Sequence, residues 1–382
     1  WRMARKVEQH PGVALDILRR YVMVYQWLPG IDAWEAYRQG LIGEQDAFAL
    51  MTHAARELAE IGYRVLDSKP QHVILDPEKL AVHGSGHLED IDYGLVDYEL
   101  LERTHEHQLA LTCRRHEAYD RQQRVLLGAA DLASDAELPD YLTSHEVFGV
   151  PYLMGRTEST GGKLWVVGHE PDAFDLFLPE RWRTTPQIRL WENHESFLTT
   201  SKDNLRLVWK VSRVGERPAT AAFGGEAFRV LAHGFNSPFE EVGMALWLLQ
   251  HGISTILPRA IYQTGHRAQL DDSLFDPSRY RSHEGICSAD GEPVLERRRN
   301  YISLWDCCGV RAFSKGEPRP VMRSLNCDEA RLMGLLSSAE TQEVLSDLAE
   351  RMLAVGIEPL RFLPSHVLVL QGSAGVGFWG RR

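Results

Sequence analysis

One stretch of the chain recurs 294 residues further on, and this repeat restricts the possible folds more than any other feature of the sequence. The shift (356 − 62 = 294) superimposes five identical residues: Gly62 and Gly356, Leu66 and Leu360, Pro70 and Pro364, His72 and His366, Val73 and Val367. Before each copy, apolar side chains recur at spacings of three and four residues, the pattern of a helix that buries one face. We therefore expect two copies of one helix–turn–strand unit.

The remaining sequence indicates a mixed α+β protein. Between residues 151 and 230, short runs of β-branched and aromatic residues alternate with Gly, Pro, Asn and Asp, which favours an antiparallel sheet. The patterns predict helices over 45–61, 98–135, 239–251 and 340–355, and strands over 21–25, 72–75, 164–167, 187–191 and 205–211.

Composition excludes several classes of protein. The 382 residues carry 53 acidic and 42 basic side chains, a formal net charge of −11, which argues against a nucleic-acid partner because that partner requires surplus Lys and Arg. No run approaches the roughly 20 consecutive apolar residues of a membrane span, and the first residues lack the apolar stretch of a signal peptide. Five scattered cysteines are typical of a reduced, cytoplasmic protein without a membrane partner.

The turn of the first copy contains a group of residues suited to chemistry. It reads Asp67-Ser68-Lys69-Pro70-Gln71-His72 and leads into an apolar strand. This resembles the catalytic loop of the protein-kinase-like fold, Asp-x-Lys-Pro-x-Asn, with His72 at the place of the metal-binding Asn. Further along, Asp92-Tyr93-Gly94 resembles the Asp-Phe-Gly motif that holds magnesium in that fold.

The resemblance implies a nucleotide partner, with ATP and Mg²⁺ as cofactors. Phosphoryl transfer places negative charge on the transferred group, so that catalysis depends on positioning and on stabilisation by cations. In this reading Asp67 is the base that orients the acceptor hydroxyl, and Lys69 neutralises the phosphoryl group. His72 and Asp92 contact the cofactor, and Asp92 is the magnesium ligand because Mg²⁺ prefers oxygen ligands.

The first copy also departs from the kinase pattern. Val65 and Leu66 precede Asp67, where the family has His-Arg or His-Gly, and imidazole is a poorer magnesium ligand than the amide that His72 replaces. No Gly-rich phosphate loop precedes the turn. The resemblance implies that the small lobe of this unit would lie mostly upstream of Trp1.

The second copy lacks the acids. Arg361 and Leu363 stand at the places of Asp67 and Lys69, and no Asp follows Arg361, so the resemblance implies a degenerate unit. Its small lobe would be the β-rich stretch 187–230, followed by the helix over 239–251.

In kinases a strand lysine pairs with a helix glutamate across the small lobe. Glu240 or Glu241 is the candidate acid in the helix. Arg229 and Lys210 both lie in apolar runs, and neither stands out as the strand cation.

These observations predict an α+β, kinase-like chain in three parts. Residues 1–150 would form the helical large lobe of a first unit, 151–265 a β-rich small lobe with its helix, and 266–382 a polar excursion and a second, reduced helical lobe. The predicted function is an atypical, nucleotide-binding phosphotransferase. The alternative is a catalytically silent pseudokinase scaffold that binds a protein partner, and a third hypothesis is an unrelated α+β protein with a partner-binding role.

Overall fold

The computed structural model is a mixed α+β structure whose described residues divide into two compact units, 27–114 and 115–378. It describes residues 27–83, 92–97, 101–128, 138–157, 160–191, 194–214, 235–267, 277–288, 291–296, 299–307, 323–358, 362–372 and 375–378. Within these ranges no helix combines the length and the apolar character that a membrane span requires. The strand expected over 21–25 lies outside the described residues.

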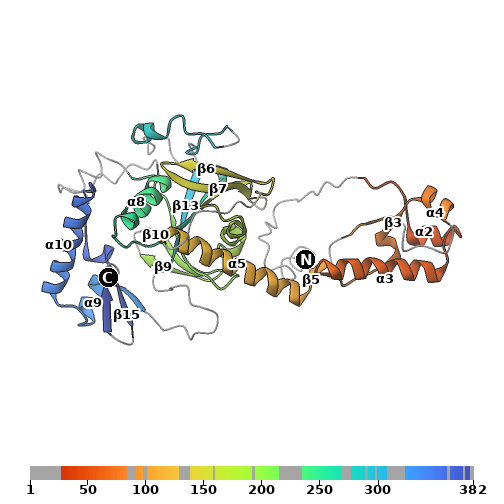
Figure 1. Cartoon of the computed structure of the whole chain (residues 1–382), viewed down its shortest axis with the longest axis horizontal. Coiled ribbons are helices and arrows are strands. Elements are labelled where there is room, and N and C mark those ends of the chain that lie inside the picture. Colours follow the sequence, from red (N-terminus) through yellow and green to blue (C-terminus); the bar gives the residue numbers. More distant parts are fainter. Residues whose placement is uncertain are drawn as a thin grey trace. The chain divides into compact units, whose positions relative to one another are not determined.

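The smaller unit is built on one long helix and two small sheets (Figure 1). Its elements are β1 (Ile31–Asp32), α2 (Ala33–Arg38), α3 (Glu44–Glu60), β2 (Tyr63–Val65), η1 (Pro70–His72), β3 (Val73–Leu75), α4 (Pro77–His83), β4 (Tyr93–Leu95), β5 (Leu101–Arg103) and the first half of α5 (His105–Leu126). The strands pair as β1-β3-β4 and as β2-β5. Leu50 of α3 packs in a core with Val73 and Leu75 of β3, so the predicted helix over 45–61 and strand over 72–75 are confirmed.

The larger unit contains an antiparallel sheet of eight strands among its described residues, in the order β6-β7-β8-β12-β13-β11-β10-β9. These strands are β6 (Leu142–Val147), β7 (Val150–Thr157), β8 (Gly162–Val167), β9 (Gln187–Trp191), β10 (His194–Thr200), β11 (Arg206–Val211), β12 (Pro258–Arg267) and β13 (Arg299–Asp306). The antiparallel sheet predicted from the sequence is confirmed, although its first strand begins before residue 151. Helix α8 (Pro238–Gln250) connects β11 with β12 along the chain and confirms the helix expected over 239–251.

Two separate cores cover the two faces of this sheet. On one face, the second half of α5 packs with η3 (Pro171–Phe177) and α6 (Pro179–Trp182) around Trp182 and Trp209. On the other face, Phe239 of α8 packs with Trp165 and Tyr301. Because both faces are covered, the interior strand β8 is buried along its whole length, and its last four residues are apolar.

The polar excursion contributes to the second core. η5 (Pro277–His283) and residues 291–296 lie along the chain between strands β12 and β13, and Val294 is completely buried. The Nζ of Lys163, on β8, lies 2.5 Å from Glu292.

The carboxylate of Glu296 in the same segment accepts hydrogen bonds from Gln263 and Arg299. Burial raises the pKa of Glu296, but these hydrogen bonds and the nearby positive charges outweigh burial and leave the pKa below its ordinary value.

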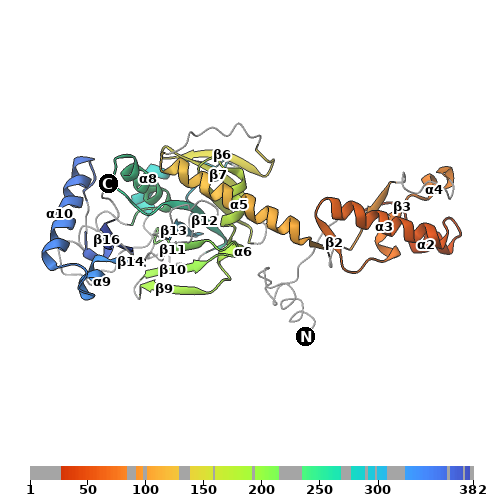
Figure 2. The same cartoon turned by 60° about the horizontal axis from the view of Figure 1, so that its bottom comes forward.

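The elements near the C-terminal end recur at the same offset as the sequence repeat. α9 (Cys327–Leu332), α10 (Ser338–Ala354) and η6 (Pro364–His366) each begin and end 294 residues after α2, α3 and η1. The three strands β14 (Arg323–Asn326), β15 (Leu368–Gly372) and β16 (Gly375–Phe378) pair in the order β14-β15-β16, matching β1-β3-β4. Figure 2 labels β14 and β16 of this sheet together with α9 and α10.

Caps and buried positions match as well. Asp32 and Asn326, 294 residues apart, are the N-caps of α2 and α9, and each side chain accepts a hydrogen bond from a backbone N–H three residues on. Gly62 and Gly356 both adopt a left-handed conformation, with φ of 87° and 82°, just after the long helix. Six pairs are buried in both copies: Ala33 and Cys327, Ala36 and Ala330, Ile42 and Leu336, Ala47 and Thr341, Val73 and Val367, Leu75 and Val369.

Candidate functional site

The turn between α3 and β3 positions the candidate catalytic residues of the first copy. Gly62 lets the chain reverse after α3, and β2 then leads into the exposed loop that carries Asp67 and Lys69. The side chains of Asp67 and Lys69 form an ion pair. The single helical turn η1 follows and places His72 directly before the buried strand β3.

The pairing of β3 with β4 determines which acid reaches His72. The strands are antiparallel, with Val73 opposite Leu95 and Leu75 opposite Tyr93. The residue before β3 and the residues after β4 therefore lie at the same end of the hairpin. His72 and Asp97 meet there, with 3.4 Å between Nε2 of the imidazole and Oδ2 of the carboxylate.

The loop after β4 holds Asp97 in a defined conformation. The backbone N–H of Val96 donates a 2.9 Å hydrogen bond to the carbonyl oxygen of His72. Asp97 itself adopts a left-handed conformation with φ of 64°, which is uncommon for a residue other than glycine. Its side chain is half exposed, whereas the side chain of His72 is largely buried.

Asp92 lies at the other end of the hairpin. It precedes β4, which pairs there with the end of β3, so a strand of about 10 Å separates it from the end that carries His72. Its carboxylate accepts a 2.6 Å hydrogen bond from Lys79, and this hydrogen bond lowers the pKa of Asp92. The structure therefore brings together His72 and Asp97, and not His72 and Asp92.

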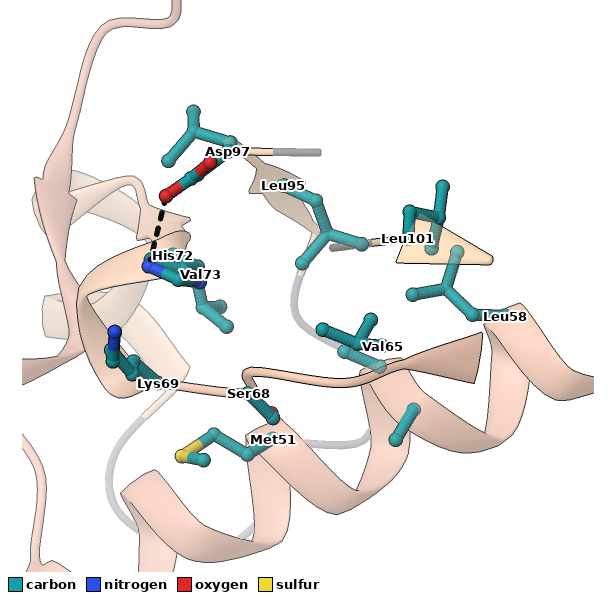
Figure 3. A pocket seen from close by; sticks show the side chains of 13 residues that line it. Met51, Leu58, Val65, Ser68, Lys69, His72, Val73, Leu95, Asp97 and Leu101 are labelled. Carbon is teal, nitrogen blue, oxygen red and sulfur yellow. Dashed lines mark ion pairs between the residues drawn. The ribbon is translucent and has the colours of Figure 1, made fainter. Parts of the chain in front are cut away.

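A small pocket opens beside this pair (Figure 3). Apolar side chains from α3, β2, β4 and β5 gather on one side, and His72 and Asp97 face each other on the opposite side. Lys69 and Ser68 of the loop also line it. The pocket lies wholly within the smaller unit and combines an apolar wall with one imidazole, one carboxylate and one ammonium group.

A second group of polar residues lies in the larger unit. The Nζ of Lys210, on β11, donates a 2.6 Å hydrogen bond to Oε1 of Glu241 on α8. Both side chains are partly buried. The strand that carries Lys210 is the third of the meander β9-β10-β11, and α8 is the next helix described.

An apolar row runs across the sheet next to Lys210. Directly paired residues of antiparallel strands share a face, and the pairing aligns Ile188, Leu198, Val208 and Trp305 across β9, β10, β11 and β13. Lys210 is two residues after Val208 and so lies on the same face. Ile188 is exposed and the other three side chains are half-buried.

The second copy retains the shape of the turn without its charges. η6 places His366 where η1 places His72, and Leu363 takes the place of Lys69 with a similar extended backbone. Arg361, at the place of Asp67, lies outside the described residues, as does Arg229. Helix α10 of this copy contacts the turn that follows α8, because Arg351 donates a 2.7 Å hydrogen bond to the carbonyl oxygen of Gly252.

Comparisons with protein-family models, with curated proteins and with solved structures found no match to this chain. The sequence assigned Asp67, Lys69 and His72 to one turn, and the structure has all three in that turn. The sequence reasoning missed Asp97, although an acid shortly after the Asp92-Tyr93-Gly94 motif was a usable signal. Lys210 was considered, but only the tertiary contact with Glu241 singles it out.

Proposed function

We propose that the chain contains two protein-kinase-like units and that the first, around the turn between α3 and β3, is a nucleotide-binding phosphotransferase. The observation that carries this proposal is the meeting of His72 and Asp97 at one end of the β3–β4 hairpin, where His72 belongs to the same turn as the Asp67–Lys69 pair. A carboxylate after a strand and a polar ligand before its partner strand match the two cation-binding positions of a kinase active site.

Each residue then has a distinct role. Asp67 accepts the proton of the acceptor hydroxyl, and Lys69 supplies positive charge toward the transferred phosphoryl group. Asp97, rather than Asp92, takes the part of the cation-binding acid. When bound, the cation supplies charge neutralisation for the nucleotide phosphates.

The second unit has a lysine–glutamate pair beside an apolar row, but its turn lacks the charged residues of the first unit. Lys210 on the third strand of a meander and Glu241 on the next described helix reproduce the lysine–glutamate pair of a kinase small lobe. The apolar row beside Lys210 suits the flat face of a nucleotide base. Because Arg361 and Leu363 stand at the places of Asp67 and Lys69, we propose that this unit is catalytically silent and acts as a scaffold for a protein partner.

Nucleotide binding and turnover together test the proposal. The full chain is titrated with ATP and a divalent cation while its melting temperature is followed, because a ligand that binds only the folded state raises that temperature. We expect a saturable rise for wild type, a smaller rise in Asp97→Asn, to which only nucleotide bound to the larger unit still contributes, and an unchanged rise in the matched control Asp92→Asn. Asp67→Asn should bind nucleotide but fail to release or transfer phosphate.

Two outcomes would contradict the proposal. If wild type shows no rise with any nucleotide and cation, the phosphotransferase is wrong and the scaffold hypothesis is left for both units. If Asp92→Asn loses the rise and Asp97→Asn keeps it, the assignment of the cation-binding acid is wrong. Lys210→Met distinguishes nucleotide binding by the two units, because this substitution should weaken only the binding of nucleotide to the larger unit.

A further inference from the structure

We infer that the cation at the His72–Asp97 end of the hairpin is a first-row transition-metal ion of the Mn²⁺ to Zn²⁺ series and not the Mg²⁺ that the resemblance implies. This inference rests on the proposed nucleotide site of the first unit. It concerns the chemical class of the metal that this site accepts.

The donor set does not fit magnesium. Mg²⁺ is a hard ion that takes oxygen ligands almost exclusively, and kinases supply an Asn oxygen at the position of His72. Here an imidazole nitrogen and the carboxylate of Asp97 stand together instead. Imidazole suits transition metals, whose affinity for nitrogen ligands rises from Mn²⁺ through Co²⁺ and Ni²⁺.

The separation of the two donor atoms fits a shared metal ion. Two ligands each about 2.1 Å from a metal lie roughly 3.0 Å apart at a right angle and roughly 3.4 Å apart at the tetrahedral angle. Nε2 of His72 and Oδ2 of Asp97 are 3.4 Å apart. This distance exceeds the usual length of a hydrogen bond between nitrogen and oxygen, about 2.7–3.2 Å.

Hydrogen bonding does not account for the orientation of the ring. Nδ1 of His72 is buried and has no hydrogen-bond partner among the residues that the structure describes. Nε2 is the ring nitrogen that faces the carboxylate of Asp97, at a distance beyond the usual hydrogen-bond length. Nε2 is therefore the atom placed to bind a cation, which would replace any proton that this nitrogen carries.

The nucleotide has to complete the coordination sphere. Within the described ranges no group of three or more His, Cys, Asp or Glu side chains converges to hold a metal alone. Two protein ligands leave positions for phosphate oxygens and water, as in other metal–nucleotide sites. We therefore expect the metal and the nucleotide to bind together.

The test measures metal preference with the full chain. At a fixed concentration of a non-hydrolysable ATP analogue, the melting temperature is followed against Mn²⁺ and against Mg²⁺ for wild type, His72→Asn and the matched control His366→Asn. Mn²⁺ binds free nucleotide phosphates more strongly by itself, so the informative quantity is the ratio of the two half-saturating concentrations, Mg²⁺ over Mn²⁺. We expect His72→Asn to reduce this ratio about tenfold, in keeping with ligand preferences, and His366→Asn to leave it unchanged.

A spectroscopic readout complements the titration and does not depend on turnover. Electron paramagnetic resonance of bound Mn²⁺ should show coupling to a ¹⁴N nucleus in wild type and in His366→Asn, and should lose it in His72→Asn. Circular dichroism checks that each variant is folded, and His72→Gln provides a second removal of the imidazole if Asn perturbs the turn.

The outcomes distinguish this inference from the function on which it rests. Equal ratios for wild type and His72→Asn, without ¹⁴N coupling, overturn the metal assignment and leave the nucleotide site intact. The absence of any rise in melting temperature with both metals overturns the nucleotide site itself. A lower ratio in His72→Asn together with the loss of ¹⁴N coupling supports the assignment.

Discussion

The fully buried guanidinium of Arg259 provides the sharpest test of what stabilises the large sheet. Arg259 lies on β12, and its side chain has no exposed surface. One terminal nitrogen donates to Asp306 at 3.0 Å and the other to Gln122 at 2.9 Å. The guanidinium also lies 3.8 Å above the ring of Tyr119, whose hydroxyl donates to the same Asp306.

Removing only the cation should be costly. In Arg259→Met, the buried carboxylate of Asp306 keeps only the Tyr119 hydroxyl among these partners, and breaking a buried ion pair costs about 3–5 kcal/mol of unfolding free energy. At about 2–4 °C per kcal/mol for a unit of this size, the melting temperature should fall by about 10 °C. Replacing both residues of the ion pair, in Arg259→Met/Asp306→Leu, should recover part of the lost melting temperature because no unpaired charge stays buried.

Tryptophan fluorescence is a suitable assay, because Trp165 and Trp182 are completely buried in the larger unit and report on its unfolding. Arg156→Met is the matched control. Its ion pair with Glu292 is 3.8 Å long and its side chain is 63% exposed, so its loss should cost less than about 1 kcal/mol. If Arg259→Met unfolds within about 1 kcal/mol of wild type, the network contributes little and the reasoning is refuted.

Three further predictions concern the two repeats and the buried groups. An alanine Cβ at Gly62 would lie 2.6 Å from Cβ of His107, while one at Gly356 would meet no atom of the described residues within 4 Å. Both substitutions incur about 1–2 kcal/mol of left-handed strain, so calorimetry should show the larger loss of stability for Gly62→Ala. Because the pKa of Glu296 is lowered, its carboxylate stabilises the fold at a pH above the ordinary glutamate pKa, and this stabilisation is lost as the pH falls through the folded-state pKa. Urea titrations from pH 5 to about 3 should therefore show a smaller loss of unfolding free energy for Glu296→Gln than for wild type. Burial raises the pKa of the Cys327 thiol, so peptide mapping should find it unlabelled by maleimide until the chain unfolds, and rapid labelling of the native protein would contradict the buried position.

The two repeats share the shape of one turn but differ in its charges, so each copy is a control for experiments on the other. The turn of the first copy carries Asp67 and Lys69, whereas the second carries Leu363 at the equivalent place on the same backbone shape. Substitutions at matched positions therefore change the chemistry of one site while the other serves as an internal control for folding. This is why His366 is an informative partner for His72 in the metal titration.

Local patterns in the sequence were sufficient for helices α3, α8 and α10 and for the repeat, whereas the helix expected over 98–135 is shorter, with strand β5 before it. The apolar periodicity of α3 and α10, the glycines after them and the Pro-x-His turns are short-range signals, because a helix and its cap depend on residues within a few positions of each other. The same local information placed Asp67, Lys69 and His72 in one turn.

Only the tertiary structure decided which distant groups meet. The antiparallel register of β3 and β4 put Asp97 beside His72 and carried Asp92 to the opposite end of the hairpin. Likewise, Lys210 and Glu241 are 31 residues apart, and only the packing of α8 on the sheet brings their side chains into contact. Such contacts depend on strand pairing and on core packing, which involve residues far apart in the chain and leave no local pattern in the sequence.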